Sequence, residues 1–246
     1  MNKKYKLRKD LSIKVKDKTL YQIQALKNFY NVKKRDLGGY IEKEVNLITT
    51  GDAWVYGNAK VYGNAKVYDD AKVYDDAEVS GNAKVYGNAW VLDNAKVYGN
   101  AKVYGDAWVY GDAWVYGNAK VYGNANVYDD AKVYGNARVY GNTEVYGSTK
   151  VYGDTSAHGN TEVYDITKVS PIVLNNACKW TLTITDCHIM IGCIIKTVQE
   201  WADWLKTDKE YQTKRGTEEF ERIEIAINCA IKLAKYIGRI KQTKRG

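Results

Sequence analysis

The stretch GNAKVYGNAKVYDDAKVYDDAEV, residues 57–79, decides the fold because it repeats a six-residue unit without interruption. Each unit reads Gly or Asp, Asn or Asp, Ala or Thr, a variable residue, Val and Tyr. From Gly51 to Ser170 the chain divides into 20 such hexads. Self-similarity at a short fixed period is the signature of a solenoid, in which each repeat stacks on its neighbours. The repeat therefore predicts a rod.

The order of residues inside the hexad indicates β-structure. Ala and Val are two residues apart, so in a strand they point to one side while the variable residue and Tyr point to the other. The two positions before Ala hold Gly, Asn or Asp, which tolerate positive φ and suit a sharp corner. A period of six does not keep Val on one face of an α-helix. We therefore expect a core of Ala and Val.

The hexads, for example VYGNAK at residues 55–60, resemble those of the hexapeptide-repeat family. The resemblance implies a left-handed parallel β-helix with three hexads in each triangular coil, and hence an all-β solenoid of between six and seven coils. At about 4.8 Å per coil the rod would be about 30 Å long. Tyr stands where the family usually has a small residue, so we expect a more aromatic outer surface.

The flanking segments resemble hexapeptide-repeat proteins encoded by phages and prophages. The similar stretches are LYQIQALKNFYNVKKRDLGGYIEKEVNL at residues 20–47, IGC at 191–193 and TVQEW at 197–201. This resemblance implies a genetic source but no activity.

The chain is expected to divide into an N-terminal cap (1–50), the β-helix (51–194) and a C-terminal helical cap (195–246), because open solenoid ends need caps. LSIKV and LYQIQAL alternate around KDKT and predict a β-hairpin cap. DLGGY predicts a tight turn into the first coil. The repeat decays at Pro171, and WTLTIT, residues 180–185, predicts a last coil strand.

Two helices are expected near the C-terminus. T-V-Q-E at residues 197–200 is a capping box that predicts a short helix with Val198, Trp201 and Leu205 on one side. A second helix should start near Thr217, with an apolar face made of Phe220, Ile223, Ile227, Ile231 and Ala234. We expect this pair to cover the open end of the solenoid, the alternative being an independent binding domain.

Charge is unevenly distributed along the chain, whose formal net charge is +8. Lys and Arg exceed Asp and Glu by 13 to 5 in residues 1–50 and by 13 to 9 in residues 171–246, whereas residues 51–170 hold 11 against 15. No run of about 18 apolar residues and no apolar segment behind the N-terminal charges is present, so we expect no membrane span and no secretion signal. The expected location is the cytoplasm, that of a host cell if a phage encodes the protein.

Residues for catalysis are scarce. The resemblance implies that enzymes of the hexapeptide family use histidines between coils, but this chain has two histidines, His158 in a Tyr position and His188. Cys178, Cys187, Cys193 and Cys229 lack the C-x2-C spacing of zinc sites, so buried thiols are expected in a reducing compartment. A Cys–His nucleophile pair would lack an identifiable acid or amide partner. We therefore expect no enzyme, no metal and no cofactor.

Residues 18 apart should stack if three hexads form a coil, and two faces then carry candidate contact residues. One face would carry cations and phenols suited to phosphates and bases: Lys66, Lys84, Lys102, Lys120, Arg138, Tyr68, Tyr86, Tyr104, Tyr122 and Tyr140. The alternative is that Lys is simply the commonest residue at this position and keeps a flat sheet soluble. A second face would expose aromatic side chains for self-association or for a cap folding back: Trp54, Trp90, Trp108, Tyr56 and Tyr110, with Leu92.

Acidic residues should gather at the corner opposite the cationic face, which would polarise the rod across its width. They are Asp75, Asp76, Asp93, Asp112, Asp129, Asp130 and Asp165. The corners leading into Lys66, Lys84, Lys102, Lys120 and Arg138 are Gly-Asn and uncharged. A nucleic-acid mimic is disfavoured because only one corner is acidic.

We therefore expect a non-catalytic binding protein of phage or prophage origin, whose partner is a nucleic acid, a nucleoprotein or an acidic protein. One form would be an antagonist of a host defence complex such as an RNA-guided nuclease. Two alternatives stay open: a structural rod, associated with a virion or tail or self-assembling, and an acyltransferase-like enzyme. The family resemblance also implies a homo-oligomer, because members often trimerise through their faces.

Overall fold

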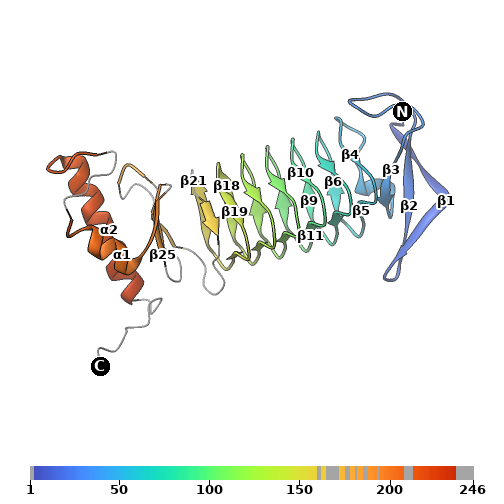
Figure 1. Cartoon of the computed structure of the whole chain (residues 1–246). Coiled ribbons are helices and arrows are strands. Elements are labelled where there is room, and N and C mark those ends of the chain that lie inside the picture. Colours follow the sequence, from blue (N-terminus) through green and yellow to red (C-terminus); the bar gives the residue numbers. More distant parts are fainter. Residues whose placement is uncertain are drawn as a thin grey trace.

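The protein is a rod with a β-hairpin at its N-terminal end and helices at its C-terminal end (Figure 1). The computed structural model describes residues 3–159, 162–164, 172–174, 178–180, 182–184, 188–192, 194–207 and 213–236. Asp165, Pro171, Cys187 and Cys193, on which sequence predictions fall, lie outside these ranges.

The hexads form a parallel β-solenoid with three faces, as predicted. Each hexad between residues 51 and 164 contributes a short strand, and strands three hexads apart pair in parallel, so that Lys66 pairs with Lys84 and Val67 with Val85. The Lys/Tyr face contains β6 (Lys66–Val67), β9 (Lys84–Val85), β12 (Lys102–Val103), β15 (Lys120–Val121), β18 (Arg138–Gly141) and β21 (Ser156–Gly159).

Two further sheets complete the solenoid. The Trp face contains β4 (Trp54–Val55), β7 (Lys72–Val73), β10 (Trp90–Val91), β13 (Trp108–Val109), β16 (Asn126–Val127), β19 (Glu144–Tyr146) and β22 (Glu162–Tyr164). The third face contains β5 (Lys60–Val61), β8 (Glu78–Val79), β11 (Lys96–Val97), β14 (Trp114–Val115), β17 (Lys132–Val133) and β20 (Lys150–Val151).

The core consists of the Ala and Val of each hexad, which are fully buried from Ala53 to Val139. Thr replaces Ala in later coils without leaving its hydroxyl unpaired. Thr143 is fully buried, and its Oγ1 donates a hydrogen bond to the Tyr140 carbonyl at 2.8 Å. Because this carbonyl lies three residues earlier in every repeat, the same solution is open to any hexad.

The corners need residues that accept positive φ, and Asp can replace Gly there. Asp93 and Asp129 have φ of 59° and 55°. Their carboxylates accept hydrogen bonds from the amides of Gly111 and Gly147, 18 residues further on, at 3.0 and 3.2 Å. Each such bond joins one coil to the next and compensates for the strain of a β-carbon at positive φ.

The N-terminal cap is the predicted hairpin, extended by a third strand. β1 (Tyr5–Val15) pairs antiparallel with β2 (Lys18–Ala25), and β2 pairs antiparallel with β3 (Leu37–Ile41). β3 then pairs in parallel with β5, so the sheet of the third face continues into the cap. A 3-10 helix, η1 (Glu44–Asn46), leads into the first coil.

The prediction of a tight turn at DLGGY is wrong, because Leu37–Ile41 is the strand β3. The two glycines are needed for close packing. A β-carbon on Gly38 would lie 2.5 Å from the Val55 carbonyl oxygen, and one on Gly39 would lie 2.6 Å from the Ala59 carbonyl oxygen. The glycines therefore let β3 lie directly on the first coil.

Two buried lysines fasten the cap to the solenoid. The Lys4 ammonium donates to the carbonyls of Gly51 and Ala53, both at 2.8 Å, and lies 4.2 Å from the centre of the Phe29 ring. Burial lowers the pKa of Lys4 to about 8. Lys72 of β7 donates to the carbonyls of Asp52 and Asp70 within the solenoid, and its ammonium reaches the cap by lying 4.6 Å from the centre of the Tyr30 ring.

The C-terminal region differs from the prediction in one respect. WTLTIT does form a strand, β24 (Leu182–Ile184), but it is not a coil strand. It pairs antiparallel with β23 (Ile172–Leu174) and β25 (His188–Ile191), and β26 (Ile194–Thr197) completes this separate sheet. The prediction followed the alternation of apolar residues, which antiparallel and parallel strands share.

Both predicted helices are present, and they pack on this sheet. α1 (Val198–Trp204) begins at Thr197 with the predicted capping box, in which the Thr197 side chain accepts from the Glu200 amide. α2 (Glu218–Tyr236) buries all five residues of its predicted apolar face. Side chains of both helices share a cluster with Leu182, Ile184, Ile189 and Ile191, so the helical cap includes a sheet that the sequence did not indicate.

Candidate polyanion-binding face

The predicted row of cations exists on the Lys/Tyr face. Lys66, Lys84, Lys102, Lys120 and Arg138 occupy equivalent positions in five successive strands. Lys66, Lys84 and Arg138 are exposed, and Lys102 and Lys120 are half-buried. Among the described residues, no carboxylate lies within ion-pairing distance of any of the five. The row is therefore a line of cations without internal neutralisation.

The tyrosines of this face form a continuous ring stack. Tyr68, Tyr86, Tyr104, Tyr122 and Tyr140 are nearly parallel, with 4.8 Å between successive ring centres, and His158 continues the stack at 4.7 Å. The inner rings have both faces covered by neighbours. They offer hydroxyls and edges to a ligand rather than open faces, so the expectation that bases would stack on these rings is wrong for the inner members.

Burial disfavours ionisation of four hydroxyls in this stack. Burial raises the pKa values of Tyr68, Tyr86, Tyr104 and Tyr122 above the ordinary value for tyrosine. A neutral phenol can donate a hydrogen bond, whereas a phenolate can only accept one. Five cations next to neutral phenols are suited to the oxygens of phosphate or carboxylate groups.

Titration of the tyrosine hydroxyls at alkaline pH should show the effect of this burial. A raised folded pKa means that the unfolded chain loses its phenolic protons first, so the contribution of these phenols to stability is constant below about pH 10 and falls as pH rises above it. Burial also raises the pKa of Tyr62 to about 12. Part of the tyrosinate absorbance should therefore rise at higher pH in the folded protein than in the protein unfolded in denaturant. Superimposable titration curves would contradict the prediction.

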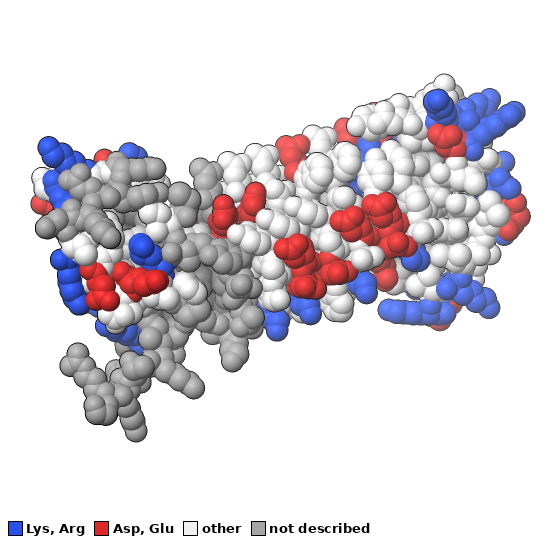
Figure 2. All heavy atoms as spheres, in the orientation of Figure 1, with Lys and Arg blue, Asp and Glu red and all other residues white. Residues whose placement is uncertain are grey.

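The predicted acidic corner is present, but acidic residues are not confined to it, because Asp52, Asp69, Asp70 and Asp106 lie at the corner that the Lys/Tyr face shares with the Trp face. The corner between the Trp face and the third face carries Asp75, Asp76, Asp93, Asp112, Asp129 and Asp130. Figure 2 shows Asp and Glu gathered along the middle of the visible side, with Lys and Arg at its lower margin and around the N-terminal cap. A polyanion approaching the rod would therefore be repelled at one corner and attracted at the opposite face.

The Trp face differs from the prediction at its N-terminal end. Trp54 is 1% exposed, because Phe29 and Tyr5 of the cap pack against its ring with centre distances of 5.2 and 6.1 Å. It is thus covered by the cap, one of the two outcomes considered for this row, and is not an exposed contact residue. Trp90 and Trp108 stack at 4.9 Å, and Trp108 is 40% exposed. Tyr56 stacks on Tyr74, and Tyr110 on Tyr128.

The third face carries a cationic row that the sequence prediction missed. Lys60, Lys96, Lys132 and Lys150 share it with Glu78 and Trp114. The Lys96 and Lys132 ammonium groups lie 5.1 and 4.8 Å from the centre of the Trp114 ring, one from the coil before and one from the coil after. Listing residues at intervals of 18 from Lys60 would have identified this row.

The residues considered for catalysis or metal binding are dispersed in the described part of the chain. His158 is in the ring stack of β21, whereas His188 begins β25. Cys178 is half-buried, but Cys229 is exposed on α2, so the prediction of buried thiols is wrong for Cys229. Within the described residues, no group of three or more His, Cys, Asp or Glu side chains is arranged to hold a metal ion.

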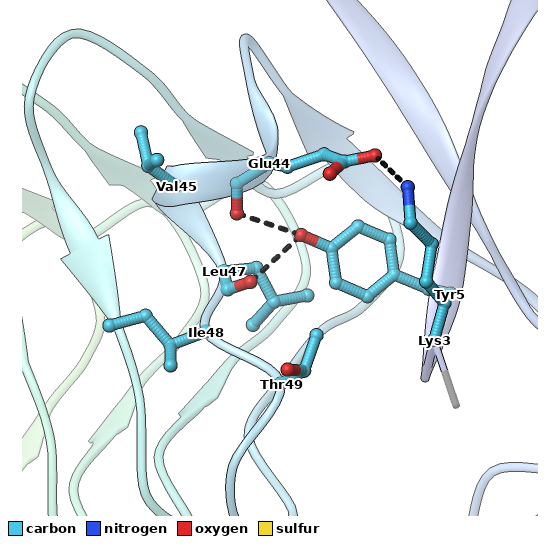
Figure 3. Close-up of a pocket in the computed structure, with 7 residues that line it drawn as sticks. All are labelled: Lys3, Tyr5, Glu44, Val45, Leu47, Ile48 and Thr49. Atoms are coloured by element: carbon cyan, nitrogen blue, oxygen red, sulfur yellow. Dashed lines mark hydrogen bonds and ion pairs between the residues drawn. The ribbon is translucent and has the colours of Figure 1, made fainter. Parts of the chain in front are cut away.

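A shallow hollow of about 320 Å³ lies within the N-terminal cap, between the start of β1 and the segment around η1 (Figure 3). The Tyr5 hydroxyl lies at its edge and contacts the carbonyls of Glu44 and Leu47 at 2.9 and 2.8 Å. Lys3 and Glu44 form an ion pair across it. The polar groups of Lys3, Tyr5 and Glu44 are thus paired with one another or with the backbone, and they join β1 to η1.

The comparisons with known proteins agree with the fold. The parallel ladders make the chain a β-solenoid protein. A family model described as YdcK Beta solenoid repeat matches residues 95–111 and 131–147, both inside the ladders. No curated protein matches the chain. Neither α1 nor α2 is long and apolar enough to cross a membrane, and this holds for the described residues only.

Proposed function

We propose that this protein is a non-catalytic binding protein whose Lys/Tyr face contacts the phosphate backbone of a nucleic acid, free or in a nucleoprotein. The observation that carries the proposal is the row from Lys66 to Arg138, in which five cations stand in register without a carboxylate partner among the described residues. An acidic protein surface is the second partner that this chemistry would accept.

Neighbouring cations in the row repel one another. Two unit charges about 5 Å apart repel by about 0.8 kcal/mol in bulk water, and more near a protein surface. Long lysine side chains relieve part of this by spreading into solvent. A polyanion relieves it more fully, because each phosphate neutralises a cation and releases a condensed counterion.

The tyrosines refine the proposed mode of binding. Because the inner ring faces are covered, contact would occur through hydroxyl donors and cations at the backbone, without base readout. We therefore expect the affinity to depend strongly on salt concentration and weakly on nucleotide sequence.

The biological setting follows from the resemblance of the flanking segments to phage and prophage hexapeptide-repeat proteins. In that setting, a protein that occupies nucleic acid or a nucleoprotein could act as an antagonist of a host defence complex such as an RNA-guided nuclease. The expectation that the chain is not an enzyme also stays a prediction. If the protein turned over an acyl donor and substitution of His158 or His188 abolished that turnover, this prediction would be wrong.

Charge reversal on the Lys/Tyr face tests the proposal. Fluorescence anisotropy with labelled single-stranded RNA and DNA should show binding that weakens with salt. The triple variant Lys84→Glu, Lys102→Glu and Lys120→Glu should bind at least 100-fold more weakly. For a single strand, the loss of three contacts should also reduce the slope of log affinity against log salt by about 2.

A matched control carries the same reversal away from this face. Lys206, Lys232 and Lys235 lie on the C-terminal cap and are exposed. Their replacement by Glu changes the net charge equally and should leave most of the affinity intact. Equal affinity for the wild type and the Lys/Tyr-face variant would overturn the proposal.

A further inference from the structure

The stack of indole rings on the Trp face ends in one open ring face. Trp90 and Trp108 are nearly parallel, with 4.9 Å between their ring centres, so the outer face of the Trp108 ring points along the rod toward the next coil. The residue paired with Trp108 in that coil is Asn126, whose side chain is short and has no ring. Trp108 is 40% exposed, whereas every other tryptophan is buried or half-buried. The surface therefore has a step over Asn126, with an aromatic platform on one side.

The third face shows which group this protein itself places on such a platform. Lys96 and Lys132, from the coils before and after, hold their ammonium groups 5.1 and 4.8 Å from the centre of the Trp114 ring. The electron-rich face of an indole attracts cations, so each face of this ring has a suitable neighbour. On the Trp face, Trp90 covers one side of Trp108, and the coil that would supply a cation to the other side has Asn126 instead.

The residues around the step carry negative charge. Glu144 pairs with Asn126 from the following coil, so a ligand over Asn126 would have Trp108 on one side and Glu144 on the other. One carboxylate oxygen of Glu144, Oε2, accepts a hydrogen bond from the Tyr128 hydroxyl at 3.1 Å. Asp106, two residues before Trp108, is exposed at the adjacent corner. Neither carboxylate forms an ion pair with another described residue.

The Trp face as a whole is bordered by acidic residues and almost lacks cations. One corner carries Asp52, Asp69, Asp70 and Asp106, and the other, beyond the tyrosine row, carries Asp75, Asp76, Asp93, Asp112, Asp129 and Asp130. Among the outward-facing residues of the described strands of this face, the one cation is Lys72, which is buried against the Tyr30 ring of the cap. The uncovered part of the face, from Trp90 onward, thus presents aromatic side chains between two lines of carboxylates.

We infer that the Trp face binds a basic segment of a partner protein, with an arginine side chain stacked on the outer face of Trp108 in the space over Asn126. The guanidinium group suits this step because it is planar, stacks on aromatic rings and directs several N–H donors at carboxylates. Glu144 and Asp106 are the carboxylates nearest to that position along the strands. The inference goes beyond the proposed function, because it rests on a different face and on a partner of opposite charge.

Peptide binding measured by fluorescence anisotropy on the full-length protein tests the inference. The probe is a short fluorescein-labelled peptide of alternating arginine and serine, whose arginines lie on one side of an extended chain. The control probe has citrulline in place of arginine, which keeps the shape of the side chain and removes its charge. The arginine peptide should bind, and the citrulline peptide should bind about tenfold more weakly or worse.

Two variants alter the step, and a third is the control. Asn126→Lys copies the position of Lys132 next to Trp114 and should cover the open indole face with the protein's own ammonium group. Trp108→Asn removes the platform without changing the charge, and Asn126 shows that the same row accepts asparagine. Each should weaken binding of the arginine peptide about tenfold. Trp114→Asn removes an indole whose faces are already occupied, so it should leave this affinity unchanged. Circular dichroism and thermal unfolding check that each variant remains folded.

The outcomes decide this inference separately from the proposed function. Absence of binding by the wild type, equal affinity for the arginine and citrulline peptides, or an affinity that either step variant leaves unchanged would overturn it. Weaker peptide binding by both step variants, with full binding by Trp114→Asn, would support it. Because Trp108→Asn leaves the Lys/Tyr face intact, its affinity for RNA and DNA should equal that of the wild type whether or not the peptide binds.

Discussion

Replacing Gly38 with alanine is expected to destabilise the protein by about 3 kcal/mol or more, because the new β-carbon has no space. It would lie 2.5 Å from the Val55 carbonyl oxygen, 2.7 Å from Ile23 and 2.8 Å from the Trp54 ring. Relief requires β3 to move away from the first coil, which uncovers Trp54. Urea unfolding with tryptophan fluorescence should show a lower midpoint and an early transition of the cap.

Gly216→Ala is the control for this substitution. Gly216 has a φ of 75°, but no atom lies within 4 Å of its expected β-carbon. Its replacement introduces backbone strain alone, which costs about 1 kcal/mol. If Gly38→Ala unfolds no earlier than Gly216→Ala, the close packing of β3 on the coil is contradicted.

Replacing Ala101 with leucine should disrupt the rod at its middle, again by about 3 kcal/mol or more. Ala101 is fully buried in β12's hexad, and the equivalent residues of the coils on either side, Ala83 and Ala119, are fully buried as well. The added carbons cannot be absorbed by one coil, because neighbouring coils repeat the same packing every 18 residues. Thermal unfolding followed by circular dichroism would measure the loss.

Ala101→Thr is the matched control, because it adds volume in a form that the repeat already accommodates. Thr143 and Thr155 occupy the Ala position and donate their hydroxyls to the carbonyls of Tyr140 and Tyr152 at 2.8 and 2.7 Å. In Ala101→Thr the corresponding acceptor is the Tyr98 carbonyl. The expected loss is about 1 kcal/mol or less, and equal losses for the leucine and threonine variants would contradict the predicted limit on core volume.

The sequence predicted which residues form the candidate site. It did not predict which parts of their side chains a ligand can reach, nor that a second face also carries cations. Counting by 18 placed Lys66 to Arg138 in one row and Tyr68 to Tyr140 in another, and the strand register confirms both. The count did not reveal that inner ring faces are covered by stacking. It also identified only one row of cations, although Lys96 and Lys132 belong to a second row on the third face.

By itself the sequence determined the solenoid: the parallel strands, the Ala and Val core, the corners and the row of cations from Lys66 to Arg138. This was possible because each repeat contacts copies of itself, so one six-residue pattern contains both sides of every contact. Tertiary structure alone decided the rest, namely the burial of Trp54 beneath Phe29, the strand at Leu37–Ile41 and the antiparallel sheet containing β24. These contacts join segments that share no pattern, and their pairing depends on shape and free space, which periodicity does not record.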